Sequence, residues 1–228
     1  MRMRRKKNLD SRIDACGELL LPFCTIGLDA RTAVLEKEYL DYNQLFGNDN
    51  PVELEVGCGK GGFICELAAQ NPDKNYIAVE KTRNVLCAAC EMAQRQGLTN
   101  VRFMNIGAEY LEKYLPDHSI SRIYLNFSCP FPKKRYEHHR LTAQRFLSIY
   151  DNLMLPGAEI HQKTDNMHFF EYSIEQLATY GYAIKNVSLD LHNSGFEGNI
   201  ITEYERRFSS AGMPIYRLEA YIKTEGII

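Results

Sequence analysis

Short apolar runs alternate with amphipathic segments along this chain from residue 50 onward. The apolar runs have the length of buried strands, and the segments between them repeat apolar residues at helical spacing. The alternation predicts an α/β fold with a doubly wound, mostly parallel sheet of seven strands. No helix is expected between the last two strands, so these should pair antiparallel at one edge. The expected strands cover residues 52–56, 75–80, 101–106, 120–126, 158–163, 183–189 and 215–221, and the expected helices cover 29–42, 61–70, 82–96, 108–114, 138–154 and 167–180.

The length of 228 residues suits one α/β domain with an N-terminal extension. We therefore expect a basic, partly disordered arm over residues 1–28 and a single domain over residues 29–228. No apolar run is long enough to cross a bilayer. The basic N-terminus lacks the apolar stretch of a secretory signal, so a cytoplasmic location is expected.

Composition and cysteine usage exclude several classes of protein. The chain is 45% hydrophobic and 25% charged, which is ordinary for a globular domain. Its seven cysteines lack the spacing of a disulfide scaffold, and reduced thiols are expected. Cys87-x-x-Cys90 lies in an expected helix without a second pair to complete a tetrahedral site, so two buried thiols are expected there rather than a metal.

Positive charge is concentrated in two places although the formal net charge is −2. A local basic patch can bind a polyanion even on a weakly acidic protein. The N-terminal group alone would be read as a solvated tail, whereas the second group lies beside a proline-rich loop. The first group is Arg2, Arg4, Arg5, Lys6 and Lys7, and the second is Lys133, Lys134, Arg135, His138, His139, Arg140 and Arg145.

A glycine loop follows the first strand of the alternation, in the spacing Gly57-x-Gly59-x-x-Gly62. Such a loop lets backbone approach a ligand at the start of a helix, but the spacing alone is a weak dinucleotide signal. Glu55 places a carboxylate beside the loop, which favours a cationic ligand such as S-adenosylmethionine over a pyrophosphate. Glu80 ends the next strand, where an acid can accept hydrogen bonds from a ribose.

Loops after the later strands carry further candidates. Gly107 and Ala108 follow the third strand, where they would flank an adenine. Phe131 lies between Pro130 and Pro132, which hold it as a surface for stacking a base. Lys133, Lys134 and Arg135 follow and are expected to hold phosphates.

Two segments nearer the C-terminus end in acids. Asp165 follows the fifth strand and would either cap the next helix or accept the paired donors of guanine. The segment Thr202-Glu203-Tyr204-Glu205 follows a glycine-rich loop that is flexible enough to close on a substrate. In it, Glu205 would be a second reader of base donors.

These segments, taken in order, resemble the bacterial tRNA (guanine-N7-)-methyltransferases. That family uses S-adenosylmethionine to methylate a guanosine in the variable loop of tRNA. The resemblance extends from the basic arm to Tyr221. It rests on Glu55-Val56-Gly57-Cys58-Gly59-Lys60-Gly61, Tyr124-Leu125-Asn126-Phe127-Ser128, Pro130-Phe131-Pro132-Lys133-Lys134-Arg135, Lys163-Thr164-Asp165-Asn166 and Thr202-Glu203-Tyr204-Glu205.

The resemblance implies a Rossmann-like class I methyltransferase fold, S-adenosylmethionine as the cofactor and tRNA as the partner of a monomer or homodimer. It implies no metal and no membrane. The positions that match Glu55 and Glu80 contact the cofactor in that family, and those that match Lys133, Asp165, Thr202 and Glu205 contact the substrate. The expected cofactor-binding set is Glu55, Gly57, Gly59, Glu80, Gly107, Ala108 and Cys129, and the expected substrate-binding set is Phe131, Lys133, Lys134, Arg135, Asp165, Thr202, Glu203, Tyr204 and Glu205.

Two positions depart from the family pattern. The family has Asp-Pro-Trp-Pro where this chain has Cys129-Pro130-Phe131-Pro132, so the candidate catalytic position has lost a carboxylate. Gly107 stands where the family usually has an acid or an amide. Guanine N7 carries a free lone pair, so alignment of the reacting atoms matters more than a general base.

Several other functions fit parts of the pattern. A noncatalytic tRNA-binding relative would follow if the loss at Cys129 abolished transfer. A covalent role for Cys129 lacks a visible basic partner. A nicotinamide oxidoreductase would use the same loop but is disfavoured by Glu55. An exocyclic-amine methyltransferase is suggested distantly by residues 128–131.

Overall fold

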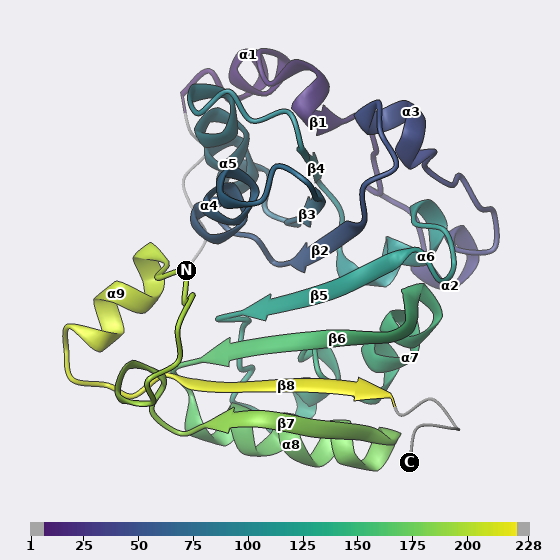
Figure 1. The fold of residues 1–228 in the computed structure, drawn as a ribbon. Coiled ribbons are helices and arrows are strands. Elements are labelled where there is room, and N and C mark those ends of the chain that lie inside the picture. The colour runs from purple at the N-terminus through teal and green to yellow at the C-terminus, as the bar shows by residue number, and fades with distance from the viewer. Residues whose placement is uncertain (1–6, 223–228) are drawn as a thin grey trace.

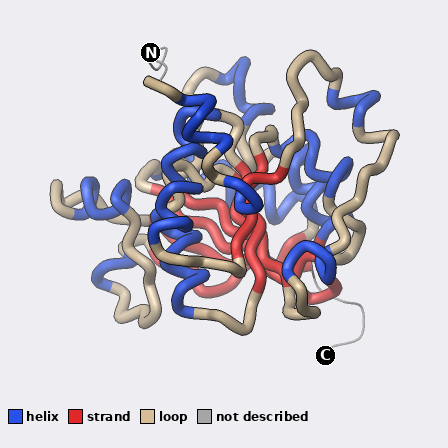
Figure 2. The backbone as a smooth tube through the Cα atoms, turned by 90° about the horizontal axis from the view of Figure 1, so that it is seen from above, coloured by secondary structure: helices blue, strands red, loops and turns tan. Residues whose placement is uncertain are grey.

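A computed structural model describes residues 7–222 and shows one twisted sheet between two layers of helices (Figures 1 and 2). The sheet has eight strands in the order β1-β4-β3-β2-β5-β6-β8-β7. All neighbours are parallel except β8, which runs antiparallel to β6 and β7. The strands are β1 (Leu20–Leu21), β2 (Val52–Val56), β3 (Asn75–Val79), β4 (Val101–Met104), β5 (Ile120–Asn126), β6 (Met154–Thr164), β7 (Tyr182–Ser188) and β8 (Tyr216–Ile222).

Helices cover both faces, as expected when parallel strands are joined by crossover connections. Helices α4 and α5 pack over β3 and β4 on one face, and α6, α7 and α8 pack on the other (Figure 1). The α-helices are α1 (Leu9–Asp14), α2 (Ala30–Ala33), α3 (Tyr42–Phe46), α4 (Gly62–Gln70), α5 (Arg83–Arg95), α6 (Leu111–Tyr114), α7 (Gln144–Leu153), α8 (Met167–Tyr180) and α9 (Glu203–Ser209), and the 3₁₀ helices are η1 (Gly17–Leu19), η2 (Ala108–Tyr110), η3 (Lys134–His139) and η4 (Leu191–Asn193).

The central strands are buried along their whole length. Every residue of β2 and β3 is buried, because helices cover both faces of this part of the sheet. Leu54 and Ile77 pack in the core under α6 and α7, while Tyr76 and Phe103 pack in the core under α4 and α5. The α/β class, the mostly parallel sheet and the antiparallel pairing of the last two strands are confirmed.

Two segments near the N-terminus differ from the expected elements. Residues 9–21, which lie in the segment expected to be a partly disordered arm, form α1, η1 and β1. Leu9 and Ile13 pack against Cys87 of α5, and β1 adds an eighth strand beside β4. The basic residues 2–6 of the arm lie outside the described residues.

The helix expected over residues 29–42 is also shorter than the pattern indicated. Asp29 caps α2 as expected, by accepting a hydrogen bond from the backbone N–H of Arg31 at 3.0 Å. The helix then ends at Ala33. Backbone N–H groups of Glu38 and Leu40 donate instead to the carbonyls of Lys113 and Tyr114, at 2.7 and 2.8 Å. Tertiary hydrogen bonds thus replace the helical ones.

The remaining helices and strands differ from the expected ones mainly in where they begin and end. The helix expected from residue 138 begins at Gln144, after η3, and β6 runs through Pro156 and Gly157 where a break was expected. Sequence reasoning missed α9, which projects beyond the carboxyl ends of the strands (Figure 1). Within residues 7–222, no helix is long and apolar enough to cross a membrane.

Candidate active site

The carboxyl ends of β2, β3, β4 and β5 open into one cavity of about 710 Å³. Ligands of open α/β sheets bind at this edge, outside the strand ends. Most of the residues expected to bind the cofactor line the cavity, and several expected to bind the substrate do so too. The lining includes Glu55, Gly57, Gly59, Glu80, Gly107, Ala108, Cys129, Phe131, Thr202 and Tyr204.

The glycine loop turns sharply between β2 and α4. Gly57 and Gly59 have φ of +85° and +58°, which residues with a Cβ rarely adopt. Gly61, at the N-cap of α4, has φ of +82°, and a Cβ there would lie 2.8 Å from the Cβ of Ala89. The loop therefore needs glycine both for its backbone angles and for the close packing of α4 on α5.

Glu55 at the tip of β2 is the most unusual group in the cavity. Its side chain is buried, and its Oε1 accepts a hydrogen bond from Nδ2 of Asn126 at 3.0 Å. Its Oε2 is buried without a hydrogen-bond partner. Burial raises the pKa of Glu55 to about 7, although the Asn126 bond and the Lys163 charge favour the ionised form. A buried carboxylate oxygen without a partner is a ready acceptor for a cationic or hydrogen-bonding ligand.

Glu80 is held in place by the start of α5. Its Oε1 accepts a hydrogen bond from the backbone N–H of Thr82 at 2.7 Å, and its own carbonyl accepts one from Asn105 Nδ2 at 2.8 Å. Thr82 is the N-cap of α5 and makes no side-chain cap itself, so the carboxylate satisfies one N–H of this helix end. The acid is thereby fixed at the cavity wall.

A third acid, Glu109, lines the cavity near Gly107. A Cβ built on Gly107 would lie 2.5 Å from Oε2 of Glu109, so the Glu109 side chain occupies the space that a side chain at 107 would take. Glu109 therefore places a carboxylate beside position 107, where the family usually has an acid or an amide.

The loop after β5 has a constrained backbone. Phe127 and Phe131 have φ of +50° and +40°, a region that costs non-glycine residues about 1 kcal/mol or more. The Phe127 backbone N–H donates to the carbonyl of Lys163 at 2.8 Å. Arg140 donates to the carbonyls of Pro130 and Phe131, at 2.8 and 3.1 Å. These bonds hold the loop in its unusual conformation.

The aromatic rings of this loop sit between two other elements. The Phe131 ring lies 5.6 Å from the His139 ring of η3, and the Phe127 ring lies 5.5 Å from the Tyr204 ring of α9. All four residues line the cavity. Sequence reasoning selected Phe131 and Tyr204 as substrate contacts, whereas Phe127 was quoted only within a family motif and His139 only within the basic cluster.

Cys129 is exposed and lies on the cavity wall. Its neighbour Ser128 also lines the cavity, and its hydroxyl is buried without a hydrogen-bond partner. Ser128 was quoted only as part of a motif. Its unpaired hydroxyl now makes it a candidate contact for a ligand.

The basic groups fall into two sets. Lys133, Lys134 and Arg135 are exposed at the start of η3 and do not line the cavity. Other cationic side chains line the cavity itself, namely Lys60, Lys81, Arg145 and Arg207. Of these, only Arg145 belongs to the basic clusters found in the sequence.

Two predicted substrate residues lie elsewhere. Asp165 does not cap α8, because that role belongs to Asn166, whose Oδ1 accepts from the Phe169 backbone N–H at 2.8 Å. Glu205 has no exposed surface, and its Oε2 lies 2.8 Å from Nζ of Lys163. Neither acid lines the cavity. The Glu203 side chain lies outside the described residues.

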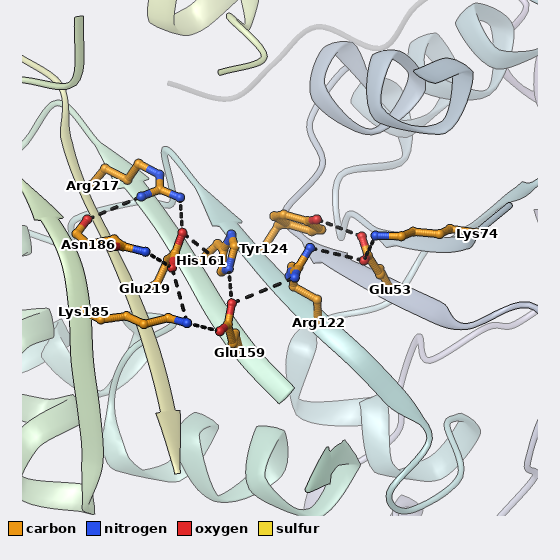
Figure 3. A network of polar contacts seen from close by, with 10 residues as sticks. All are labelled: Glu53, Lys74, Arg122, Tyr124, Glu159, His161, Lys185, Asn186, Arg217 and Glu219. Atoms are coloured by element: carbon orange, nitrogen blue, oxygen red, sulfur yellow. Dashed lines mark hydrogen bonds and ion pairs between the residues drawn. The ribbon is translucent and has the colours of Figure 1, made fainter. Parts of the chain in front are cut away.

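A network of charged groups covers the open face of β5, β6, β8 and β7, beside the site (Figure 3). Glu159, His161 and Glu219 have the spacing of a metal site. Lys185 and Arg217 already bond to these two carboxylates, and Asn186 donates to Glu219 at 2.6 Å. The surrounding cations match the acids in charge, which favours a structural network over a cation site.

Comparison with known proteins connects this geometry to a family. The family described as "Putative methyltransferase" matches residues 49–218. A tRNA (guanine-N(7)-)-methyltransferase of Bacillus subtilis (strain 168) is 49% identical over 183 residues, covering 80% of this chain and 86% of that protein. The protein of the same name from Geobacillus sp. (strain WCH70) is 49% identical over 178 residues, covering 78% and 81%.

Solved structures confirm the fold. The 16S rRNA methyltransferase KamB superposes with a TM-score of 0.59 at 18% identity, covering 82% of this chain and 96% of that one. The [4+2]-cyclase SpnF superposes with a TM-score of 0.55 at 14% identity, covering 86% and 82%. Since proteins with such different titles share it, the fold alone does not fix the reaction.

Replacing Glu55 with glutamine should stabilise the ligand-free protein at high pH. The raised pKa of Glu55 means that its contribution to stability is complete below its ordinary value near 4.5 and is lost as pH rises through about 7. The variant avoids this loss, which amounts to about 3 kcal/mol. Urea unfolding at pH 5 and pH 8 measures the difference. The matched control is Glu66→Gln on the exposed face of α4, and an equal gain for Glu55→Gln at both pH values would contradict the prediction.

Proposed function

Because this chain belongs to the tRNA (guanine-N(7)-)-methyltransferase family, we propose that its cavity transfers a methyl group from S-adenosylmethionine to N7 of a guanosine in tRNA. The guanosine lies in the variable loop. The observation that carries the proposal is the buried Oε2 of Glu55, which has no hydrogen-bond partner and lies beside a glycine loop. An acceptor of this kind suits a positively charged donor and opposes a pyrophosphate.

The acids around the cavity suit the parts of the donor. S-adenosylmethionine supplies a methyl group on a positively charged sulfur. Glu55 is placed to bind the donor's positive groups, and Glu80, fixed by the Thr82 N–H, to accept hydrogen bonds from ribose hydroxyls. Glu109 takes the space beside Gly107 and Ala108, where it would accept hydrogen bonds from an adenine amine.

The aromatic residues suit a purine acceptor. The backbone of Phe131 is held by the Arg140 bonds, and its ring lies against His139 at the cavity, where a base could stack on it. A base stacked on such a ring gains about 1–3 kcal/mol. Because N7 already carries a lone pair, the protein's task is to align the base and to favour the positive charge that develops on it. The exposed Cys129 at the cavity wall is compatible with this task, which needs no general base.

The cationic side chains suit the phosphates of the RNA. Lys133, Lys134 and Arg135 are exposed beside the cavity, and Arg145 and Arg207 line it. Phosphate contacts position an RNA without reading its sequence. The site therefore combines a cation-binding donor half with a stacking surface and a basic rim.

The purified protein should form 7-methylguanosine in tRNA. The experiment incubates it with labelled S-adenosylmethionine and unmodified tRNA, digests the RNA and identifies the labelled nucleoside. Donor binding measured by calorimetry should be lost in the double variant Glu55→Ala, Glu80→Ala. A label on an exocyclic amine, or no transfer by a protein that binds the donor, would refute the proposed reaction.

Cys129→Asp should speed methyl transfer, a reaction that the wild-type protein is already expected to catalyse. A carboxylate at the cavity wall would favour the cationic methylated base, so we expect a rate increase of roughly tenfold in single-turnover assays. Cys129→Asn has the same shape without the charge and is the matched control. If the aspartate variant were no faster than the asparagine variant, a carboxylate at this position would have no part in the reaction.

Neutralising Lys133, Lys134 and Arg135 to serine should weaken tRNA binding and flatten its dependence on salt. Each lost phosphate contact reduces the salt slope by about one unit. Binding of S-adenosylmethionine should be unchanged, because these side chains do not line the cavity. Arg31→Ser in the exposed α2 serves as the control, and an unchanged slope in the triple variant would exclude this segment as a phosphate contact.

A further inference from the structure

A buried ion pair joins the tip of β6 to α9. Nζ of Lys163 lies 2.8 Å from Oε2 of Glu205, and the Glu205 side chain has 0% exposed surface. The side chain of Lys163 is 7% exposed, and its ammonium also lies 5.3 Å from the centre of the Phe63 ring. The pair therefore forms out of contact with water, between segments 42 residues apart in the chain.

The same two side chains gather the loop that precedes α9. Lys163 donates to Oδ1 of Asn199 at 3.0 Å and to the carbonyl of Ile200 at 2.9 Å. Asn199 in turn donates to Oε1 of Glu205 at 2.6 Å, and Nε2 of His192 lies 3.1 Å from the same oxygen. All three hydrogen-bond donors of Lys163 and both oxygens of Glu205 thus hold residues between 192 and 205.

Helix α9 has little else to hold it. Among its residues whose side chains are described, Glu205 alone is buried. Thr202 caps the helix by accepting from the Glu205 N–H at 2.9 Å, and Tyr204 reaches Phe127 across the cavity. Thr202, Tyr204 and Arg207 line the cavity, so the position of α9 decides where these three groups stand.

Stability alone is a weak reason for such a pair. Taking two charges out of water costs several kcal/mol each, and an apolar pair of similar volume is often as stable. The ion pair makes directional hydrogen bonds to Asn199, Ile200 and the start of α9. An apolar pair could not make these bonds. Its location, on the face of β6 beside Asn126 and Glu55, joins α9 to the donor half of the site.

We propose that Lys163 and Glu205 are positioning residues that hold α9 against the cavity, so that Thr202, Tyr204 and Arg207 meet the RNA acceptor. The inference rests on the proposed function and assigns Glu205 to the protein's own loop, in place of reading the base as the sequence suggested. The buried carboxylate has its oxygens occupied by Lys163, Asn199 and His192, which leaves no donor of a base a route to it.

Asn199→Ala separates the two roles of Glu205. It removes bonds to both members of the pair but leaves both charges, and Asn199 itself does not line the cavity. If the pair positions α9, this variant raises KM for tRNA or lowers kcat by roughly 10- to 100-fold, because small misplacements of contact groups are costly. If Glu205 reads the base directly, Asn199→Ala leaves both constants unchanged. Glu197→Gln, an exposed acid in the same loop, is the matched control.

Hydrogen exchange gives a second readout that does not depend on activity. Asn199→Ala and Glu205→Gln should speed exchange of the amides of residues 203–209 while the amides of β2 and β5 keep their protection. The affinity for S-adenosylmethionine should stay within about twofold of the wild-type value, because neither variant changes a residue that lines the cavity. A tenfold change in this affinity would correspond to about 1.4 kcal/mol.

The outcomes distinguish the two proposals. Unchanged exchange in α9, unchanged tRNA kinetics in Asn199→Ala, or an equal loss of donor and tRNA binding overturns the positioning role. Failure of the wild-type protein to methylate tRNA overturns the proposed function instead, and the exchange of α9 still decides whether the pair holds the helix.

Discussion

The half-satisfied carboxylate of Glu55 is the interaction on which the rest of the site depends. It lies on a strand buried on both faces, where an ionised acid would ordinarily be too costly, and only Asn126 donates to it in the described structure. Nearby, the Lys163 charge lowers its pKa and the Glu80 charge raises it. A cationic ligand removes this cost by supplying the missing partner. The unpaired carboxylate lowers the stability of the ligand-free protein, and a ligand that pairs with it would gain that free energy on binding. The fold tolerates the loss of stability because the surrounding strands are deeply buried.

The halves of the site are built on different supports. The donor half consists of strand tips and the glycine loop, whose backbone bonds to Val79 at 2.8 and 3.0 Å continue the sheet. The acceptor half consists of the loop after β5 and of α9, neither of which belongs to the sheet. These segments are held by side chains instead, through Arg140 and Lys163. In the proposed function, the part of the site fixed by the sheet would bind the small donor, and the part held by side chains would bind the large RNA.

The sequence could predict which strand-end residues gather at the cavity, because their signals are local. Strand periodicity and glycine spacing indicate where the backbone turns, and Glu55 and Glu80 follow from their places at strand ends. It could not predict the contacts of Glu205 or the place of the Glu109 side chain, since these depend on segments distant in the chain or on the direction of one side chain. The failed helix over residues 34–41 has the same cause, because tertiary bonds to Lys113 and Tyr114 replace its local ones.

A count of basic residues in the sequence overestimates how many of them are free to contact RNA. Arg140 belongs to the cluster expected to bind RNA, yet its guanidinium donates to two loop carbonyls and lies 4.3 Å from the centre of the Tyr172 ring. Lys163 is likewise committed to carbonyl and carboxylate oxygens inside the protein. A cation whose donors already bond to carbonyls inside the protein would have to break these hydrogen bonds to bind a phosphate. Internal hydrogen bonds thus separate Arg140 and Lys163 from exposed cations such as Lys133, which the proposed function assigns to contacts with RNA phosphates.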